Sequence, residues 1–427
     1  MKPHRILLAL ILCALPAAAQ EVAFHPYDEA RAALGRLLFW DPILSGNRNI
    51  SCGTCHHPDL GTADGLSLGI GEGGTGLGPK RVAGDIRKRI PRNAPGLWNV
   101  GAVEFTTFFH DGRVGHSDDY GNGYDSPAEE WLPDGLPNLL AVQALFPLTS
   151  RFEMAGNVGE NEVVGAVDDR IDYGWPILAK RVRTIPVYGE MFVAAFDLDD
   201  AEDVMIAHVA IALADFMNSE WRSLDAPWDA WRAGTGDLTP AQHRGRVLFF
   251  GRGRCASCHS GSLFTDHGFH ALALPPFGPG RTRRFDPAVR DVGRMGETDA
   301  LEDAYRFRTP SLRNVTRTAP YGHNGAYPTL EGIIRHHADP ARGLAAWTPD
   351  LARLPDAPQL AEIDFVVRQD AREMARVANR VDIAPVELSE AEIADLVAFL
   401  GALEGGASLA GRLGIPEAVP SGLPVDR

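Results

Sequence analysis

The chain has 427 residues, of which 45% are hydrophobic and 23% are charged. These values argue against a disordered or a membrane-embedded chain, and the length predicts two or three domains. The 56 acidic and 41 basic residues give a formal net charge of −15. This charge argues against a nucleic-acid partner, because phosphate binding needs a basic face, and it favours a cationic or neutral partner.

The first residues have the pattern of a secretory signal peptide. Lys2 and Arg5 precede an apolar run over 6–15, and the small residues 17–19 follow it. This order predicts a signal peptide over 1–19 that is removed on export, and therefore a location in the periplasm. The apolar run is too short to cross a bilayer and no later run is long enough, so we expect no membrane span.

The cysteines carry the strongest chemical signal. Apart from Cys13, where the bulky Leu12 disfavours a lipid anchor, all of them lie in two CxxCH motifs: Cys52, Cys55 and His56, and Cys255, Cys258 and His259. Four cysteines in an exported protein would ordinarily predict two disulfides. The histidine after each pair favours covalent haem attachment instead, with two thioether bonds and a proximal histidine ligand to iron at each motif. Zinc is disfavoured, because zinc ribbons separate their cysteine pairs by about 15–20 residues.

Sequence blocks around the two motifs repeat. LGRLLFWD (34–41) precedes the first motif and RGRVLFFG (244–251) precedes the second. The blocks that follow them, 95–112 and 310–325, share P-x-L-x-N-V and a terminal H-[DN]-G. This duplication predicts two haem domains in tandem, an N-terminal domain over 20–225 and a C-terminal domain over 226–427.

Helix signals dominate the rest of the chain. Capping boxes begin at Thr239 and at Ser389, and the apolar residues of 204–216 fall on one helical face. The many glycines and prolines indicate long ordered loops. We therefore expect a mainly α fold of two cytochrome c-like haem domains with long irregular loops. The glycine-rich stretch 69–78 contains GxGxxG but lacks the flanking strand and helix of a dinucleotide site, so we interpret it as a loop over the first haem.

The ordered set CGTCH, ADGLSLGIG, RNAPGLWN, FHDGR, EM, CASCH, TPSLRN and TAPYGHNG resembles the bacterial di-haem cytochrome c peroxidase family, including its MauG branch. The resemblance spans nearly all of the chain after the signal peptide. It implies that peroxide meets the N-terminal haem and that the C-terminal haem stores or relays electrons.

The resemblance also assigns roles to single residues. Gln143, Pro147 and Glu153 match the family's distal residues over the peroxidatic haem, with Glu153 as the acid–base group that cleavage of a peroxide requires. Calcium is implied between the domains, and the residues that match its ligand positions are Asn93, Thr318 and Pro320.

The chain departs from the family at three positions. Glu72 stands where many members have a distal histidine, which predicts an open or water-bound sixth site on the first haem. At the second haem the register places His337 where the peroxidases have methionine and MauG has tyrosine, and His336 is the less favoured alternative. His110 replaces the tryptophan between the haems, so electrons need another route, through Trp98 or Trp40, or a slower hop. Both tryptophans are also typical core residues, and we assign no relay.

Residues 114–142 form an acidic insertion that is longer than the family's usual connection. It is most simply a solvated loop, although its position near the distal site is compatible with a partner surface.

Together these features predict a periplasmic di-haem c-type peroxidase that reduces hydrogen peroxide. Electrons would come from a small periplasmic cytochrome c or copper protein. Two alternatives stay open: MauG-like, peroxide-dependent oxidation of a partner protein, and a di-haem electron-transfer cytochrome in which both irons are six-coordinate. A homodimer is compatible with the sequence.

Overall fold

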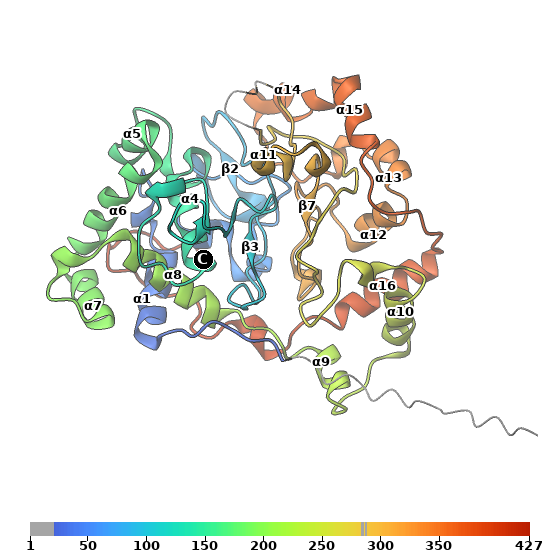
Figure 1. Ribbon diagram of the computed structural model, residues 1–427, viewed down its shortest axis with the longest axis horizontal. Helices are drawn as coiled ribbons and strands as arrows, with labels where there is room; N and C mark the ends of the chain where they lie inside the picture. Colours follow the sequence, from blue (N-terminus) through green and yellow to red (C-terminus); the bar gives the residue numbers. More distant parts are fainter. Residues whose placement is uncertain (1–20, 283–285, 287) are drawn as a thin grey trace, which may run out of the picture.

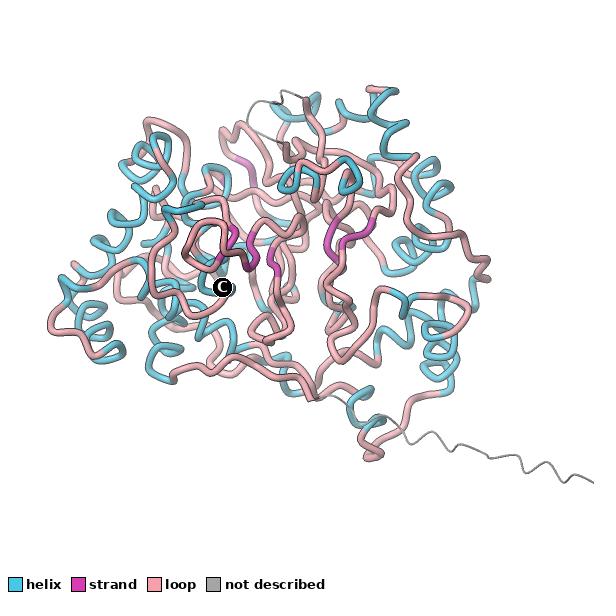
Figure 2. Tube along the Cα trace, viewed as in Figure 1, coloured by secondary structure: helices cyan, strands magenta, loops and turns pink. Residues whose placement is uncertain are grey.

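The computed structural model describes residues 21–282, 286 and 288–427. The predicted signal peptide and Cys13 lie outside the described residues. The described chain is mainly helical, as expected, and its few strands are two or three residues long. Helices gather on both sides of the molecule, with the strands β3 and β7 between them (Figures 1 and 2). None of the described helices combines the length and the apolar character needed to cross a bilayer.

The first half of the chain contains helices that lie on one side of Figure 1. Their bounds are α1 Glu29–Trp40, α2 Cys52–Cys55, α3 Leu139–Ala144, α4 Phe146–Thr149, α5 Glu162–Asp169, α6 Gly174–Arg183, α7 Pro186–Phe196 and α8 Ile206–Glu220. Short antiparallel pairings connect the strands of this half, which are β1 Gly74–Thr75 with β2 Val82–Ala83, and β3 Thr107–Phe108 with β4 Val114–His116 and β5 Tyr124–Asp125.

The second half forms the other side of the molecule. Its helices are α9 Pro227–Arg232, α10 Pro240–Phe250, α11 Met295–Thr298, α12 Leu330–Ala338, α13 Pro340–Ala346, α14 Ala361–Asp364, α15 Ala371–Ala378 and α16 Glu390–Gly401. Strand β6 Phe269–His270 pairs antiparallel with β7 Phe307–Arg308. Both predicted capping boxes are confirmed, with Thr239 at the start of α10 and Ser389 at the start of α16.

The duplicated blocks fold into equivalent helix pairs. A Cβ atom at Gly35 of α1 would lie 1.9 Å from the Ala212 carbonyl oxygen of α8. A Cβ atom at Gly245 of α10 would lie 1.9 Å from the Asp395 carbonyl oxygen of α16. The same close helix crossing therefore occurs in each half, and in each half only glycine permits it.

Two related asparagines tie each P-x-L-x-N-V block to the end of a helix. Both Asn99 and Asn314 have a left-handed backbone, with φ of 59° and 57°. The Asn99 side chain accepts a hydrogen bond of 2.7 Å from the backbone nitrogen of Ser223, after α8, and the Asn314 side chain accepts one of 2.7 Å from that of Gly405, after α16. The repeat in the sequence is thus a repeat in backbone geometry.

The C-terminal tail returns to the first half. Val419 is buried in the apolar core that α1 and α8 form. The Ser421 hydroxyl donates a 2.7 Å hydrogen bond to Asp41, and the Thr54 hydroxyl, inside the first CxxCH motif, donates one to Asp426. The tail of the predicted second domain is therefore part of the packing around the first motif.

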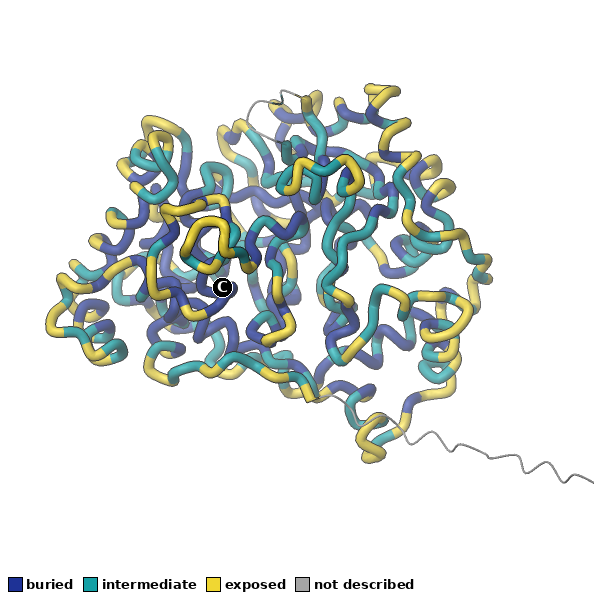
Figure 3. The backbone as a smooth tube through the Cα atoms, in the orientation of Figure 1, coloured by how far each residue is buried: buried dark blue, intermediate teal, exposed yellow. Residues whose placement is uncertain are grey.

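Most of the insertion 114–142 lies at the surface. It forms β4 and β5, a short helical turn at 129–131 and the start of α3. Its acidic residues at 118, 119, 129, 130 and 134 are exposed, which Figure 3 shows as a largely yellow segment near the C-terminus. Pro127 at its base lines the cavity described below.

Candidate haem cavity and catalytic site

Both CxxCH motifs open into one cavity. Its volume is about 1240 Å³, and the residues Cys52, Cys55 and His56 line it together with Cys255, Cys258 and His259. Pockets for a single small ligand usually measure about 300–1,000 Å³. This cavity is larger, and it is continuous between the two halves, as two neighbouring flat cofactors require.

The two motif histidines are held in the same way. The Nδ1 atom of His56 lies 2.9 Å from the Thr62 carbonyl oxygen, and that of His259 lies 3.0 Å from the Phe264 carbonyl oxygen. Such a bond makes Nδ1 the protonated nitrogen and leaves Nε2 as a free lone pair. Burial lowers the pKa of both imidazoles, which keeps the rings neutral. Each histidine is therefore oriented to ligate an iron atom through Nε2.

The described cysteines form neither the disulfides nor the four-cysteine zinc site that compete with haem attachment. None of the described cysteines is in a disulfide. Among the described residues, one cysteine belongs to a cluster that could hold a metal ion. It is Cys258, and the other members of the cluster are Asp266 and His270. The four thiols therefore do not converge on a zinc ion. All of them line the haem-sized cavity, where thioether formation would place them.

The charge of the cavity wall also suits haem. In a chain of net charge −15, basic side chains outnumber acidic ones among the described residues of this wall. The basic residues are Arg87, Lys88, Arg92, Arg113, Arg254, Arg281, Arg308 and Arg313, and the acidic ones are Glu153, Asp286 and Asp382. Haem carries two carboxylates, so a wall with excess positive charge is complementary to it.

The predicted distal residues lie together on the wall of the first half. Gln143 near the end of α3, Pro147 in α4 and Glu153 in the next turn all line the cavity. Burial raises the pKa of the Cys55 thiol to about 12, and the carboxylates of Asp64 and Glu153 add to this rise. Glu153 and the first haem-attachment motif thus line the same cavity.

A five-residue π-turn, Arg151–Ala155, presents Glu153 to the cavity. The carbonyl oxygen of Glu153 accepts a 3.0 Å hydrogen bond from the backbone nitrogen of Glu72, and the Met154 carbonyl oxygen accepts one of 2.7 Å from Gly46. Two separate loops thus fix the backbone of the turn. Single π-turns are uncommon and are frequent at functional sites.

Two arginines act on the Glu153 carboxyl group. Burial raises the pKa of Glu153, while the charges of Arg113 and Arg281 oppose that rise. Arg113 stacks on the Phe109 ring at 3.4 Å from its centre and donates a 3.1 Å hydrogen bond to Asp111. The carboxyl group is therefore buried enough to exchange protons above its ordinary range.

Glu72 does not reach the cavity. Its Oε1 atom accepts hydrogen bonds of 2.6 Å from Asn47 and 2.9 Å from Asn49, and it is not among the residues that line the cavity. Burial raises the pKa of Glu72. The residue in the family's distal-histidine position therefore faces away from the first motif.

The glycine-rich stretch is a loop, as expected, but it lies behind the distal turn rather than over the cavity. None of the residues 69–78 lines the cavity. A Cβ atom at Gly71 would lie 2.8 Å from the Cα atom of Glu153. Arg81 stabilises the loop by donating hydrogen bonds of 2.6–2.7 Å to the carbonyl oxygens of Ile70, Gly71 and Gly76. Its interpretation as a cover of the first haem was wrong, because the Arg151–Ala155 turn comes between.

The two adjacent histidines of α12 have different surroundings. Both ring nitrogens of His336 are engaged, at 2.8 Å from the Tyr327 hydroxyl and 2.8 Å from the Leu272 carbonyl oxygen. His337 lines the cavity, and its Nδ1 atom lies 2.8 Å from the Ile333 carbonyl oxygen, which leaves Nε2 free. Burial lowers the pKa of His259 to about 4, and His337 contributes to this fall. The free nitrogen thus belongs to the histidine that lines the same cavity as His259.

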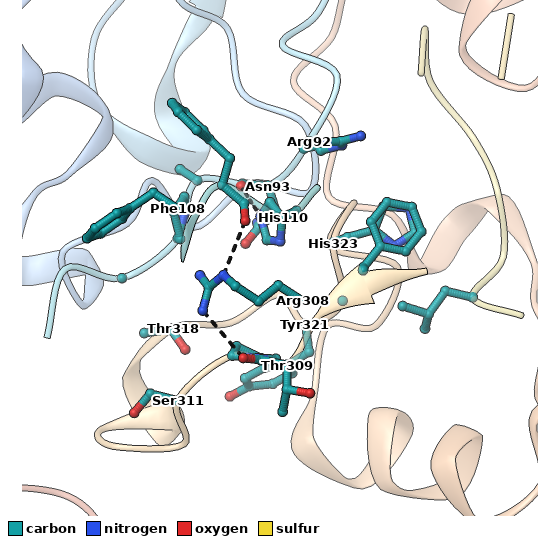
Figure 4. A pocket seen from close by; sticks show the side chains of 18 of the residues that line it. Arg92, Asn93, Phe108, His110, Arg308, Thr309, Ser311, Thr318, Tyr321 and His323 are labelled. Atoms are coloured by element: carbon teal, nitrogen blue, oxygen red, sulfur yellow. Dashed lines mark hydrogen bonds between the residues drawn. The ribbon is translucent and has the colours of Figure 1, made fainter. Parts of the chain in front are cut away.

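The predicted calcium ligands lie at the junction of the two halves. Asn93, Thr318 and Pro320 all line the cavity, and Figure 4 shows Asn93 and Thr318 on opposite sides of Arg308. The backbone nitrogen of Asn93 donates a 2.9 Å hydrogen bond to His323, and its side chain donates one of 2.7 Å to Leu66. Oxygen donors from both halves thus line the same cavity.

His110 occupies the same junction. Its Nε2 atom lies 3.1 Å from the Asn93 carbonyl oxygen, and burial, with the charge of Arg92, lowers the pKa of His110 to about 4. Of the two tryptophans considered as electron routes, Trp98 lines the cavity and Trp40 does not. Trp40 instead packs edge-on against His57, with ring centres 5.5 Å apart.

Sequence reasoning missed a buried charge network between the halves. Asp111 forms ion pairs with Arg92, Arg113 and Arg281 at 2.6–3.1 Å, and Arg92 also pairs with Asp291 at 2.8 Å. Burial opposes ionisation of Asp111, but the three guanidinium groups outweigh it and hold its pKa well below the usual range. The motif FHDGR contains Asp111 and Arg113, but Arg92 precedes the motif and Arg281 lies in the second half of the chain.

A family model described as di-haem cytochrome c peroxidase matches residues 29–237. The methylamine utilization protein MauG of Methylorubrum extorquens is 27% identical over 383 residues, which cover 89% of this chain and 80% of that protein. The chain is thus similar to di-haem cytochrome c peroxidases over most of its length. This similarity implies haem as the cofactor and an oxidoreductase of the peroxidase type.

Solved structures agree with this similarity. A MauG-like protein associated with microbial copper homeostasis superposes with a TM-score of 0.61 at 25% identity, covering 93% of this chain and 97% of that one. The diheme peroxidase BthA from Burkholderia thailandensis superposes with a TM-score of 0.59 at 25% identity, covering 95% and 92%. The similarity extends across both halves of the cavity.

Proposed function

We propose that this chain is a periplasmic di-haem c-type peroxidase that reduces hydrogen peroxide to water. The observation that carries the proposal is the asymmetry of the cavity. Glu153 and Gln143 face it in the first half, whereas a histidine with a free Nε2 atom faces it in the second. The overall reaction consumes one peroxide, two electrons and two protons and yields two water molecules.

The chain would hold two haems covalently. Cys52 and Cys55 would attach the first and Cys255 and Cys258 the second, with His56 and His259 as proximal ligands. When bound, the first haem would supply the iron centre at which the peroxide O–O bond breaks. Glu153 would take a proton from the inner oxygen and deliver it to the outer oxygen, so that water departs. Gln143 would hold the peroxide by hydrogen bonds.

The second haem would be closed to peroxide. His259 and His337 would ligate its iron on both faces, so that this half stores and relays electrons. Replacing a methionine ligand by histidine lowers a haem potential. The electron donor is a small periplasmic cytochrome c or copper protein, and the exposed acidic insertion favours a donor with a basic surface.

The ferric protein tests the assignment directly. Because Glu72 faces away from the cavity, we expect the EPR spectrum of the fully ferric protein to show one high-spin and one low-spin haem, and we expect peroxide to react without prior reduction. Haem content and stopped-flow absorption complete the measurement. A purely low-spin spectrum with no peroxide reaction would contradict the proposal and would point to a protein ligand such as Met154 or Met217, which line the same cavity.

Calcium is expected to stabilise the junction. We propose Asn93 and the backbone carbonyl groups of Thr318 and Pro320 as its ligands, because hard cations prefer oxygen donors. Chelation with EGTA should lower the melting temperature, and calcium at about 100 times its Kd should restore about 2.7 kcal/mol. Asn93→Ala should lose most of this response, whereas Asn379→Ala, at an exposed position, should keep it. A calcium-loaded protein whose melting temperature EGTA does not change would refute the site.

The comparison with MauG supports a second candidate function, the peroxide-dependent oxidation of a partner protein. The loss of the inter-haem tryptophan and of the tyrosine ligand disfavours a close copy of that chemistry. Mass spectrometry of candidate partners after peroxide treatment separates the two enzymatic functions. The EPR spectrum described above separates both from a plain electron-transfer cytochrome.

A further inference from the structure

Arg308 is a half-buried cation at the junction between the two halves. It lies at the end of strand β7, and its Nε atom donates a 3.2 Å hydrogen bond to the Phe109 carbonyl oxygen of the first half. Its Nη1 atom approaches the Thr309 carbonyl oxygen at 3.4 Å, and its backbone nitrogen donates a 2.8 Å hydrogen bond to His110. Figure 4 shows the side chain between the segment that carries Asn93 and His110 and the segment that carries Thr309.

The buried arginines near Arg308 have carboxylate partners, whereas Arg308 has none among the described residues. Arg92 pairs with Asp111 and Asp291, and Arg313 pairs with Asp229 through two hydrogen bonds of 2.7 and 2.8 Å. The partners of the Arg308 guanidinium group are backbone carbonyl groups. Burial without a compensating charge lowers the pKa of Arg308 to about 10.

Contacts with neutral groups do not compensate for the free-energy cost of partly removing the Arg308 charge from water. Removing an unpaired ion from water is unfavourable, even when the removal is partial. The Phe105 ring, whose centre lies 5.8 Å from the guanidinium carbon, is a weak cation–π partner and carries no negative charge. A half-buried guanidinium group that lines a cavity and has no carboxylate partner is therefore arranged for an anion, and its planar donor set matches a carboxylate.

We infer that Arg308 binds a carboxylate group of a covalently bound haem at the junction of the two halves. This inference rests on the proposed di-haem function, because it requires haem in the cavity. The Arg308 charge would stabilise the electron-rich ferrous state of the haem that it contacts and would raise its reduction potential. Since β7 also bonds to His110, one residue would bind the cofactor and join the halves where the family's tryptophan is missing.

The test uses the haem-loaded protein and spectroelectrochemical titration of both haems. Arg308→Gln should change the reduction equilibrium of one haem about tenfold towards the ferric state, which corresponds to 59 mV for one electron. The same haem should gain a pH-dependent potential, because its carboxylate loses the cation that keeps it ionised. Arg308→Lys should give a smaller shift in the same direction. Arg342→Gln removes the same charge from an exposed position on α13 and should leave both potentials unchanged.

Two results would overturn the inference. The first is an Arg308→Gln or Arg308→Lys protein that keeps two haems and both potentials. The second is a wild-type potential that depends on chloride or phosphate while that of Arg308→Gln does not, which would assign Arg308 to a small free anion. Haem content and peroxide turnover of the wild-type protein test the proposed function separately, so its failure is distinguishable from that of the Arg308 assignment.

Discussion

Glu153→Gln is expected to lower kcat/KM for hydrogen peroxide by a factor of about 10²–10⁴, the usual contribution of a general acid–base group. Glutamine keeps the size of the side chain but cannot accept and return a proton. Steady-state and stopped-flow kinetics measure the loss, and the optical spectrum should show both haems unchanged. Glu190→Gln, at an exposed position on α7, removes the same charge and should retain full activity. Equal rates for the Glu153 variant and the wild type would remove Glu153 from the mechanism.

The pH dependence of kcat/KM should report the same group. Glu153 must be ionised to take the first proton, so activity falls as pH drops through its pKa. Burial raises the pKa of Glu153, so the acid limb should lie above the ordinary glutamate value of about 4.3. Arg113 and Arg281 oppose this rise, so Arg113→Gln should move the limb to higher pH, whereas Arg113→Lys should move it less. If the acid limb of the Arg113→Gln protein stays at the wild-type pH, Arg113 does not influence the acid–base step.

His337→Met is expected to raise the potential of the second haem by a substantial part of the roughly 0.8 V range that axial ligands span. A thioether donates less electron density than imidazole and therefore favours the ferrous state. His337→Ala should instead convert that haem from low spin to high spin. Spectroelectrochemistry and EPR measure the two effects.

His336 provides the matched control, because it is the adjacent histidine on the same helix. Both of its nitrogens are engaged by Tyr327 and Leu272. His336→Ala should therefore leave the spin state and the potential of the second haem unchanged, while unfolding becomes easier by about 1–3 kcal/mol for each buried polar group left without a partner. A spin-state change in His336→Ala with none in His337→Ala would reverse the assignment.

The helical framework was largely predictable because its signals are local. The capping boxes at Thr239 and Ser389 and the apolar face of 204–216 require only neighbouring residues, and the structure confirms a helix at each. The loop at 69–78 was predicted as a loop but misplaced. Its position depends on Arg81 and on the contact of Gly71 with the Arg151–Ala155 turn, and no local pattern encodes such a contact.

In the candidate site, too, local sequence predicts some functional residues and not others. The CxxCH motifs could be found from sequence because haem attachment needs its cysteines and histidine within five consecutive residues. The roles of Arg113 and Arg308 could not. Arg113 acts on Glu153, which only folding brings near it, and the role of Arg308 depends on the absence of a carboxylate partner. No sequence pattern predicts that the C-terminal tail returns to the first half, where Asp426 accepts a hydrogen bond from Thr54.

The sequence by itself determined the chemistry that the chain offers: two haem-attachment motifs, a duplicated helical frame and a set of distal residues that the family resemblance picks out. Only the tertiary structure decided which groups are available to that chemistry. It left Nε2 of His337 free while engaging both nitrogens of His336, turned Glu72 towards Asn47 and Asn49, and left the half-buried Arg308 without a carboxylate partner. The physical reason is that covalent attachment and helix capping act between neighbours in the chain, whereas hydrogen-bond saturation and charge compensation are settled by the groups that folding brings together.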